Sequence, residues 1–264
     1  MPDFVLAIDQ GTTGSTVALM DARGKLRASV NFEFPQVYPR PGWVEHRPAE
    51  IWSSVARGIR AILRKKLCKP ADIAAIGITN QRETSLLWDR HTGEPFNNAI
   101  VWQCRRTTDF CESLRQAGHE PFIRRKSGLV LDPYFSASKY RWLLNNSSGI
   151  SRALKSGRVA AGTIDSFLIW QLTAGKSHVT DISNASRTSL MDIERGRWDA
   201  DLLGLFEVPP EILPRIGPSS GLLGYTRGVA GLPDGIPIAG AAGDQQAALF
   251  GQACFDPGDA KCTY

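Results

Sequence analysis

Short apolar runs alternate with polar segments along the chain, and their spacing predicts most of the strands and helices. Val5–Ile8 and Val17–Met20 are brief, partly β-branched runs that flank small and hydroxylic residues, which predicts a β-hairpin. A third strand is expected over Lys25–Phe34. The continuous apolar run Ile73–Thr79 is typical of a buried strand. Between them, helical spacing predicts a helix that opens at Pro48 and buries Ile51, Val55, Ile59 and Ile62.

The rest of the chain continues this alternation with weaker signals. Two short strands are expected in "LLWD" and "AIVWQ", and helices around Arg105–Ala117 and Ala137–Asn145. "AAGTIDSFLIWQLT" is expected to form a turn and an apolar helix, and Asp192–Gly235, rich in Pro and Gly, to meander with short helices. "IPIAGAAGDQQAALFG" predicts a strand, a glycine-rich turn containing Asp244, and a helix. The whole pattern indicates one α/β domain over residues 1–264.

Composition and charge narrow the class of protein. The 264 residues are 42% hydrophobic and 22% charged, as in a globular protein with an ample core. Lys and Arg exceed Asp and Glu by 31 to 26, but the basic clusters Arg64–Lys66 and Arg124–Lys126 are short and lack interleaved aromatic residues, so we interpret them as solvated helix faces and expect no nucleic-acid partner. Five cysteines without a C-x-x-C pair predict neither a zinc site nor a disulfide framework. With no charged leader and no run of about 18 apolar residues, we expect no membrane insertion and a cytoplasmic location.

The loop between the first two strands suits a phosphate group. Gly11–Thr16 contains only Gly, Thr and Ser, so backbone N–H groups and hydroxyls lie at close range with no bulky side chain in the way. Asp9 stands at the end of the first strand, a suitable place for a carboxylate that meets a metal ion. A plain polar hairpin turn explains the same residues equally well.

Asp9 and Asp244 lie far apart in the sequence but in similar positions, each at the end of a predicted strand. If both turns face one cleft, one carboxylate can hold Mg²⁺ while the other accepts a proton from a substrate hydroxyl. Phosphoryl transfer needs this combination of positioning, charge neutralisation and a base near the nucleophile. The residues therefore favour a Mg²⁺ and phosphate site.

A second polar cluster follows the predicted strand Ile73–Thr79. Arg82 and Glu83 place several donors beside an acceptor, which suits adjacent alcohol groups of a polyol, although a surface ion pair accounts for them equally well. Trp102 and Tyr134 can pack against the carbon side of such a molecule, and simple core packing is the alternative for each. "AGKS" is not a Walker loop because Trp170 stands where its first Gly is required, and G-x-G-x-x-G is absent. The spacing G-x-S-x-G occurs as "GPSSG" in the Pro- and Gly-rich segment, but not between a predicted strand and a predicted helix, as the nucleophile elbow of a serine hydrolase requires.

Several blocks together resemble the glycerol kinases of the FGGY carbohydrate kinase family: "AIDQGTTGST", "GITNQRET", "NAIVWQCRRT", "LDPYFSASK", "GTIDSFLIWQLT", "TDISNASRT" and "AGAAGDQQAALFGQ". They run in family order from residue 4 to the end of the chain. The "DQGTT" hairpin is shared with xylulose and gluconate kinases, whereas the combination of "NQRET", "VWQ", "DPYFSASK" and "GDQQAAL" is more specific to glycerol.

The resemblance implies a ribonuclease-H-like (actin-like ATPase) α/β fold, with a mixed β-sheet flanked by helices, and phosphorylation of glycerol by ATP to sn-glycerol 3-phosphate. It implies that Asp9 and Asp244 meet Mg²⁺ and that Asp244 is also the general base. It further implies that Thr12, Thr13 and Gly14 approach the ATP phosphates. The residues that it implies for holding glycerol are Arg82, Glu83, Trp102, Tyr134, Asp244 and Gln245.

Three departures from the family pattern leave alternatives open. The chain stops at "KCTY", where the family continues into a second, nucleotide-binding domain; Thr16 stands near a position where relatives usually carry Arg; and "YTRGVAGLPDGIPIAG" lacks the Gly- and Arg-rich loop tied to inhibition by fructose 1,6-bisphosphate. The chain is therefore expected to be the glycerol-binding domain alone. An inert polyol-binding module, a kinase for another sugar or polyol such as xylulose, and a homo-oligomer formed through uncovered apolar surface remain alternatives.

Overall fold

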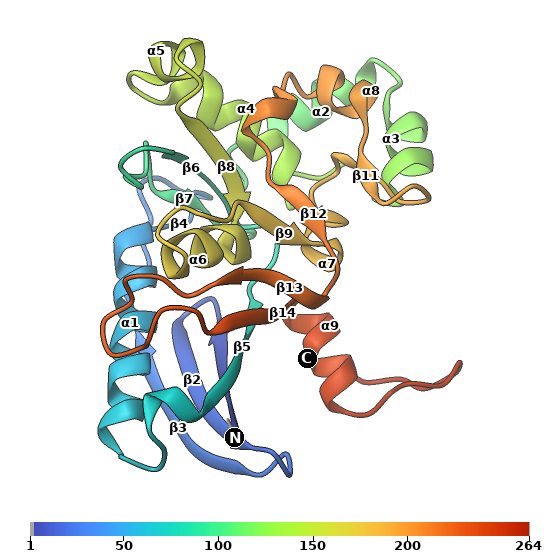
Figure 1. The fold of residues 1–264 in the computed structure, drawn as a ribbon. Coiled ribbons are helices and arrows are strands. Elements are labelled where there is room, and N and C mark those ends of the chain that lie inside the picture. Colours follow the sequence, from blue (N-terminus) through green and yellow to red (C-terminus); the bar gives the residue numbers. More distant parts are fainter. Residues whose placement is uncertain (1–2, 264) are drawn as a thin grey trace.

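The computed structural model describes residues 3–263 and contains a six-stranded and a four-stranded sheet with helices packed around both (Figure 1). The strands are β1 (Phe4–Gln10), β2 (Gly14–Asp21), β3 (Leu26–Glu33), β4 (Glu45–His46), β5 (Ile73–Asn80), β6 (Ser85–Asp89), β7 (Ala99–Ile100), β8 (Val159–Thr163), β9 (Val179–Asp181), β10 (Met191–Asp192), β11 (Arg197–Trp198), β12 (Arg215–Gly217), β13 (Ser220–Tyr225) and β14 (Pro237–Gly243). The helices are α1 (Pro48–Arg64), α2 (Thr108–Gln116), α3 (Glu120–Ser127), α4 (Ser136–Asn146), α5 (Ile150–Lys155), α6 (Ile164–Leu172), α7 (Ile182–Ala185), α8 (Ala200–Leu205) and α9 (Asp244–Gly251), with 3₁₀ turns at Pro70–Asp72 and Pro210–Ile212.

The six-stranded sheet is mixed, with the strand order β13-β14-β5-β1-β2-β3. β1 and β2 form the expected antiparallel hairpin, whereas β5 runs parallel to β1 and β14 runs parallel to β5. Gln10 pairs with Asn80, and Asn80 pairs with Gly243. The carboxyl ends of these three parallel strands therefore stand in one row, where open α/β sheets place their sites.

One face of this sheet is covered by α1 and α6. The buried stripe of α1 packs on β2 and β3 as its periodicity predicts, and Gly58 allows close approach, because a Cβ there would lie 2.4 Å from Val17 Cγ2. Leu6 and Ile8 of β1 point into this core, whereas Asp9 points to the opposite, solvent-accessible face. The alternation of a strand thus buries apolar residues on one side and presents the carboxylate on the other.

A second hydrophobic cluster lies around the four-stranded sheet β4-β7-β6-β8. Figure 1 shows α2, α3, α4, α5 and α8 gathered at this end of the molecule, away from the six-stranded sheet. Their buried residues include Cys111, Ile123, Leu143 and Leu202. The loops that link the two sheets pass through the row of strand ends, which is where the polar residues of interest meet.

Several sequence expectations needed correction. The segment expected to open with a turn begins with β8, whose small residues are all buried and show no alternation; Gly162 lies so close to Ser166 and Trp88 that a Cβ would overlap both. No glycine-rich turn precedes Asp244, because β14 continues to Gly243 and α9 begins at Asp244 itself. The expected strand "AIVWQ" is only Ala99–Ile100, and the Asp192–Gly235 region adds strands that its Pro and Gly content did not reveal.

Candidate active site

Three loops leave the row of strand ends and carry most of the predicted site residues. Gly11–Thr13 follow β1, Gln81–Thr84 follow β5, and Asp244 follows β14 as the first residue of α9. Hydrogen bonds join these loops: the Gln81 backbone N–H donates to Gln10 O over 2.7 Å, and the Gln81 side-chain amide donates to Gly11 O over 3.1 Å. The structure thereby brings the N-terminal hairpin, the "NQRET" segment and the "GDQQ" segment to one place.

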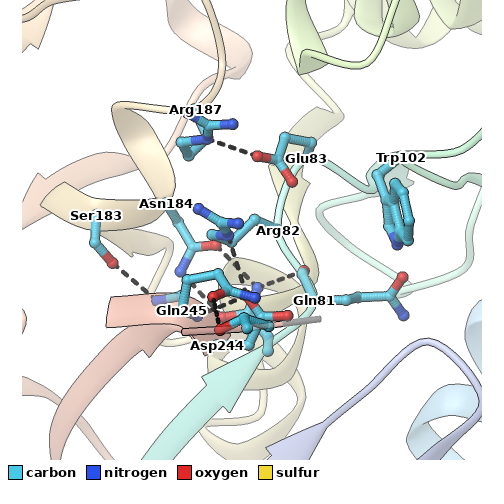
Figure 2. A network of polar contacts seen from close by, with 12 residues as sticks. Gln81, Arg82, Glu83, Trp102, Ser183, Asn184, Arg187, Asp244 and Gln245 are labelled. Carbon is cyan, nitrogen blue, oxygen red and sulfur yellow. Dashed lines mark hydrogen bonds and ion pairs between the residues drawn. The ribbon is translucent and has the colours of Figure 1, made fainter. Parts of the chain in front are cut away.

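Arg82 and Asp244 form the central contact of the site. Arg82 Nε donates to Asp244 Oδ1 over 3.0 Å, and the backbone N–H of Gln245 donates to the same oxygen over 2.7 Å (Figure 2). Asp244 Oδ2 has no protein partner among residues 3–263. One carboxylate oxygen is therefore held in place, and the other is free to meet a ligand.

Glu83 is buried, with 1% exposure, and its backbone has φ +60°, a conformation that is unfavourable for a residue with a Cβ. Its carboxylate accepts a hydrogen bond from Arg187 Nε over 2.6 Å. Burial raises the pKa of Glu83, and the nearby charges of Arg82 and Arg187 oppose that rise. The site thus contains a desolvated carboxylate whose charge depends on its cationic neighbours.

The two aromatic residues predicted to contact a polyol stand together. The Trp102 and Tyr134 rings are 5.5 Å apart between centroids, and Arg187 lies 5.9 Å from the Tyr134 ring. The Trp102 indole N–H donates to Thr12 Oγ1 over 3.1 Å. This bond connects the aromatic pair directly to the loop predicted to bind phosphate.

The loop Gly11–Thr13 is held by backbone and side-chain bonds. Gly11 N donates to Gly14 O over 2.9 Å, and the Gln36 side-chain amide donates to Thr12 O over 2.9 Å. Beneath it His46, fully buried, contacts Gln36 Oε1 at 2.5 Å. Burial lowers the pKa of His46 to about 4, so the imidazole is neutral near pH 7. The loop therefore rests on an uncharged polar support.

Asp9 and Asp244 influence each other electrostatically. The pKa of Asp9 is raised, first because neighbouring protein atoms displace water from its carboxylate and second because of the Asp244 charge. Asp9 borders a cavity of about 610 Å³ beside β1, β5 and β14, whose lining also includes Ser183 and Gln246. The residues that line this cavity do not include Asp244. The two carboxylates are close enough for their charges to interact, and a cleft shared by both stays a prediction.

The remaining predicted residues, Thr13, Gly14 and Gln245, lie in the same loops and have other hydrogen-bond and packing partners. Thr13 O accepts a hydrogen bond from Phe34 N over 3.2 Å, and Gly14 is the first residue of β2, so closely packed that a Cβ would lie 3.0 Å from Phe32 O. The Gln245 side-chain oxygen accepts from Lys261 Nζ over 2.7 Å. Gln245 is therefore engaged with the C-terminal segment in this structure.

Sequence reasoning missed the residues that support the site from a distance. Ser183 Oγ accepts the Gly243 N–H over 2.8 Å, and the Asn184 side chain exchanges two hydrogen bonds, of 2.9 and 3.0 Å, with that of Asn80. Figure 2 shows the side chains of Ser183 and Asn184. Ser183, Asn184 and Arg187 all belong to the block "TDISNASRT". The block was noted for its family resemblance, but it has no helical or strand period that would assign a role to its individual residues.

Comparison with known proteins identifies the family. The N-terminal domain of the FGGY family of carbohydrate kinases matches residues 4–251. A glycerol kinase of Bdellovibrio bacteriovorus is 55% identical over 264 residues, covering 100% of this chain and 53% of the relative. Glycerol kinase 2 of Thermotoga maritima is 52% identical over 262 residues, covering 99% of this chain and 52% of the relative. The chain belongs to the FGGY family of carbohydrate kinases, and it spans about half the length of the curated relatives it matches.

Solved structures agree with this assignment. The crystal structure of Plasmodium falciparum glycerol kinase with ADP superposes with a TM-score of 0.90 at 37% identity, covering 99% of this chain and 52% of that one. A xylulose kinase from Rhodospirillum rubrum has a TM-score of 0.86 at 24% identity, covering 97% of this chain and 52% of that one, and shows the fold alone. The expected ribonuclease-H-like, actin-like ATPase fold, with a mixed sheet flanked by helices, is confirmed.

Proposed function

We propose that this chain is the glycerol-binding half of a kinase that transfers the γ-phosphoryl group of ATP to glycerol and yields sn-glycerol 3-phosphate. The observation that carries the proposal is the contact of Arg82 with Asp244 beside the buried carboxylate of Glu83. Together with the Trp102–Tyr134 ring pair, this arrangement offers donors and acceptors for hydroxyls and an apolar wall for carbon atoms. Relatives named glycerol kinases support glycerol as the polyol.

Asp244 is the proposed general base. Its Oδ1 is occupied by Arg82 and Gln245, so Oδ2 is the oxygen available for the proton of the attacking hydroxyl. The hydroxyl oxygen forms the new bond to the γ-phosphorus as the bond to the β-phosphate oxygen breaks, and ADP leaves with the electron pair. Arg82 keeps the carboxylate oriented toward the position of the attacking hydroxyl.

The hairpin loop is proposed to meet the nucleotide. Thr12, Thr13 and Gly14 offer hydroxyls and backbone N–H groups to the ATP phosphates. Asp9 and Asp244 fit Mg²⁺, because this ion binds proteins through one or two carboxylates and takes its other ligands from phosphate and water. A cation would also offset both causes that raise the pKa of Asp9, which are burial first and the Asp244 charge second. When bound, the ion neutralises phosphate charge.

The proposal includes the organisation of the whole protein. Residues 1–264 are proposed to form a single FGGY-type N-terminal domain. A C-terminal nucleotide-binding domain, which is not part of these 264 residues, is proposed to complete the cleft; the chain covers 53% of a glycerol kinase relative. All five cysteines are free, which suits the proposed cytoplasmic location. Among the described residues no helix is both long and apolar enough to cross a membrane. Assembly into a homo-oligomer is a further part of the proposal that gel filtration tests.

The first experiment measures binding by the chain. Calorimetric titration of the purified 264-residue protein with glycerol is expected to give saturable heat, whereas 1,3-propanediol, which lacks the middle hydroxyl, is expected to bind at least about tenfold more weakly because buried polar groups are left unpaired. Equal affinity for both diol and triol, or preference for xylulose, would refute glycerol as the substrate.

The second experiment measures catalysis. Glycerol-dependent ADP release is followed for this chain alone and joined to an FGGY C-terminal domain, with Asp244→Asn in both. The joined protein is expected to turn over, and Asp244→Asn to lower kcat by about 10²- to 10⁴-fold. Unchanged kcat in that variant would exclude Asp244 as the base. Saturable glycerol binding without ADP release by the joined protein would identify a binding module instead.

A further inference from the structure

Lys139 is a buried cation for which the proposed reaction has no use. It belongs to the first turns of α4 and is 0% exposed. No carboxylate among the described residues lies within ion-pair distance of its ammonium group. Burying an unpaired ammonium costs several kcal/mol, so an apolar side chain of the same length would be the cheaper way to fill this space.

The ammonium group instead makes hydrogen bonds with three backbone carbonyls. Nζ donates to Glu83 O over 3.2 Å, to Phe135 O over 3.4 Å and to Tyr134 O at close range. An ammonium has three protons, so each has a carbonyl partner. Burial lowers the pKa of Lys139 to about 7, while the Glu83 carboxylate opposes that decrease. The carbonyl dipoles thus take the place of a counter-ion.

These carbonyls belong to two segments that carry the proposed polyol contacts. Glu83, 56 positions before Lys139, lies in the strained turn after β5, with φ +60°. Its carbonyl also accepts hydrogen bonds from Ser85 Oγ over 2.9 Å and Ser136 Oγ over 3.1 Å. Tyr134 lies just before α4, and its ring belongs to the aromatic pair. One side chain therefore joins the turn that carries Arg82 to the segment that carries the aromatic wall.

We propose that Lys139 is a positioning residue for the polyol pocket: its ammonium fixes the Glu83 turn against the Tyr134 segment and so sets the spacing between the Arg82–Glu83 pair and the aromatic wall. This inference deepens the proposed function and rests on it. A local left-handed conformation costs about 1–2 kcal/mol and persists only where its surroundings hold it, and the three donors on the Glu83 carbonyl provide that restraint.

The test compares Lys139→Met with Lys126→Met. Both remove an ammonium and leave a straight apolar chain, but Lys126 bonds Asp199 and Asp192 and lies outside the pocket. Glycerol affinity is measured by calorimetry on the full 264-residue chain, well below the melting temperature of each variant, so that the folded fractions are equal. We expect Lys139→Met to weaken glycerol binding by about tenfold or more and Lys126→Met to change it less than about twofold.

In the joined protein, Lys139→Met should raise KM for glycerol and leave KM for ATP unchanged. The hydrogen-bond partners of Lys139 are Glu83, Tyr134 and Phe135, and none of them belongs to the phosphate loop. A merely structural role would lower the active fraction and leave both KM values as they are. Lys139→Gln keeps two N–H donors without the charge, and an affinity between those of wild type and Lys139→Met is expected. This neutral variant also provides the test if the methionine variant does not fold.

The outcomes separate this inference from the proposed function. If the wild-type chain binds glycerol and both Lys139 variants that fold bind it within about twofold of wild type, the positioning role is wrong and the proposed function stands. Equal effects on the KM values for glycerol and ATP would also overturn the positioning role. If the wild-type chain shows no glycerol binding, the proposed function fails and this inference fails with it.

Discussion

Gly243→Ala is expected to damage the proposed polyol site by adding a single methyl group. The backbone at Gly243 has φ −58° and ψ 149°, values that alanine adopts readily, so no backbone strain is introduced. A Cβ at this position would lie 2.4 Å from Arg82 Cδ and 2.7 Å from Arg82 Cγ. Carbon atoms in contact stay about 3.5–4.0 Å apart, so the Arg82 side chain has to retreat by about 1 Å.

This displacement separates Arg82 Nε from Asp244 Oδ1, which are 3.0 Å apart in the structure. A hydrogen bond to a charged group contributes about 1.5–3 kcal/mol, so we expect glycerol affinity to fall by about 10- to 100-fold. Calorimetric titration of the chain with glycerol measures the loss. Gly251→Ala is the matched control, because it lies at the other end of α9 and its Cβ would meet no atom within 4 Å.

A double-mutant cycle identifies the cause. If the methyl group acts by moving the arginine, Gly243→Ala should add nothing to the effect of Arg82→Met, whereas independent effects should add. Two results would refute the reasoning: wild-type affinity in Gly243→Ala, or full additivity of the two substitutions. The first would mean that the position of Arg82 does not determine glycerol binding, and the second that the methyl group acts elsewhere.

Further predictions concern acid stability and the metal site. Burial lowers the pKa of His46 from 6.5 to about 4, so between these two pH values the unfolded chain binds a proton at this residue and the folded chain does not. The free energy of unfolding should therefore decrease by about 3 kcal/mol as the pH falls from 6.5 to about 4. Urea titrations between pH 4 and pH 7 should show this slope reduced in His46→Gln and unchanged in the exposed control His91→Gln; an unreduced slope in His46→Gln would contradict the assignment. Asp9 has a raised pKa, so its contribution to stability is lost as the pH rises through that pKa, and Asp9→Asn should melt at a higher temperature than wild type at pH 7.5 without Mg²⁺. The same variant should lose the extra stabilisation that MgATP gives to wild type, and retention of that stabilisation would exclude Asp9 as a metal contact.

The sequence predicted those parts of the fold that have a local signal. The hairpin of β1 and β2 and the helix α1 follow from alternation and helical spacing, because each has one buried and one exposed side. β8 was missed because its residues are small and Ala160–Gly162 resemble a turn, whereas β6, which is equally buried, has large apolar side chains that predict a strand. The boundary at Asp244 was missed for a similar reason, since glycines that read as a turn are here a strand packed against its neighbours.

The candidate site was predictable where it consists of loops after strands. Arg82 and Asp244 were singled out because polar residues follow apolar runs, and the structure brings them into contact. Lys139 and Arg187 act on Glu83 across 56 and 104 positions, and no local pattern encodes such contacts. The positive φ of Glu83 was equally invisible, because it results from restraints supplied by distant segments rather than from the residue itself.

The hydrogen bond from the Trp102 indole to Thr12 has a consequence for how this scaffold can diversify. Replacing Trp102 to reshape the aromatic wall for a different alcohol also removes a donor from the loop that is proposed to bind the nucleotide, so a change at this one position is expected to affect both substrates. Because Trp102 and Thr12 are in contact, substitutions at these two positions are expected to have non-additive effects, and a change at Trp102 is expected to be tolerated better with a compensating change near the hairpin.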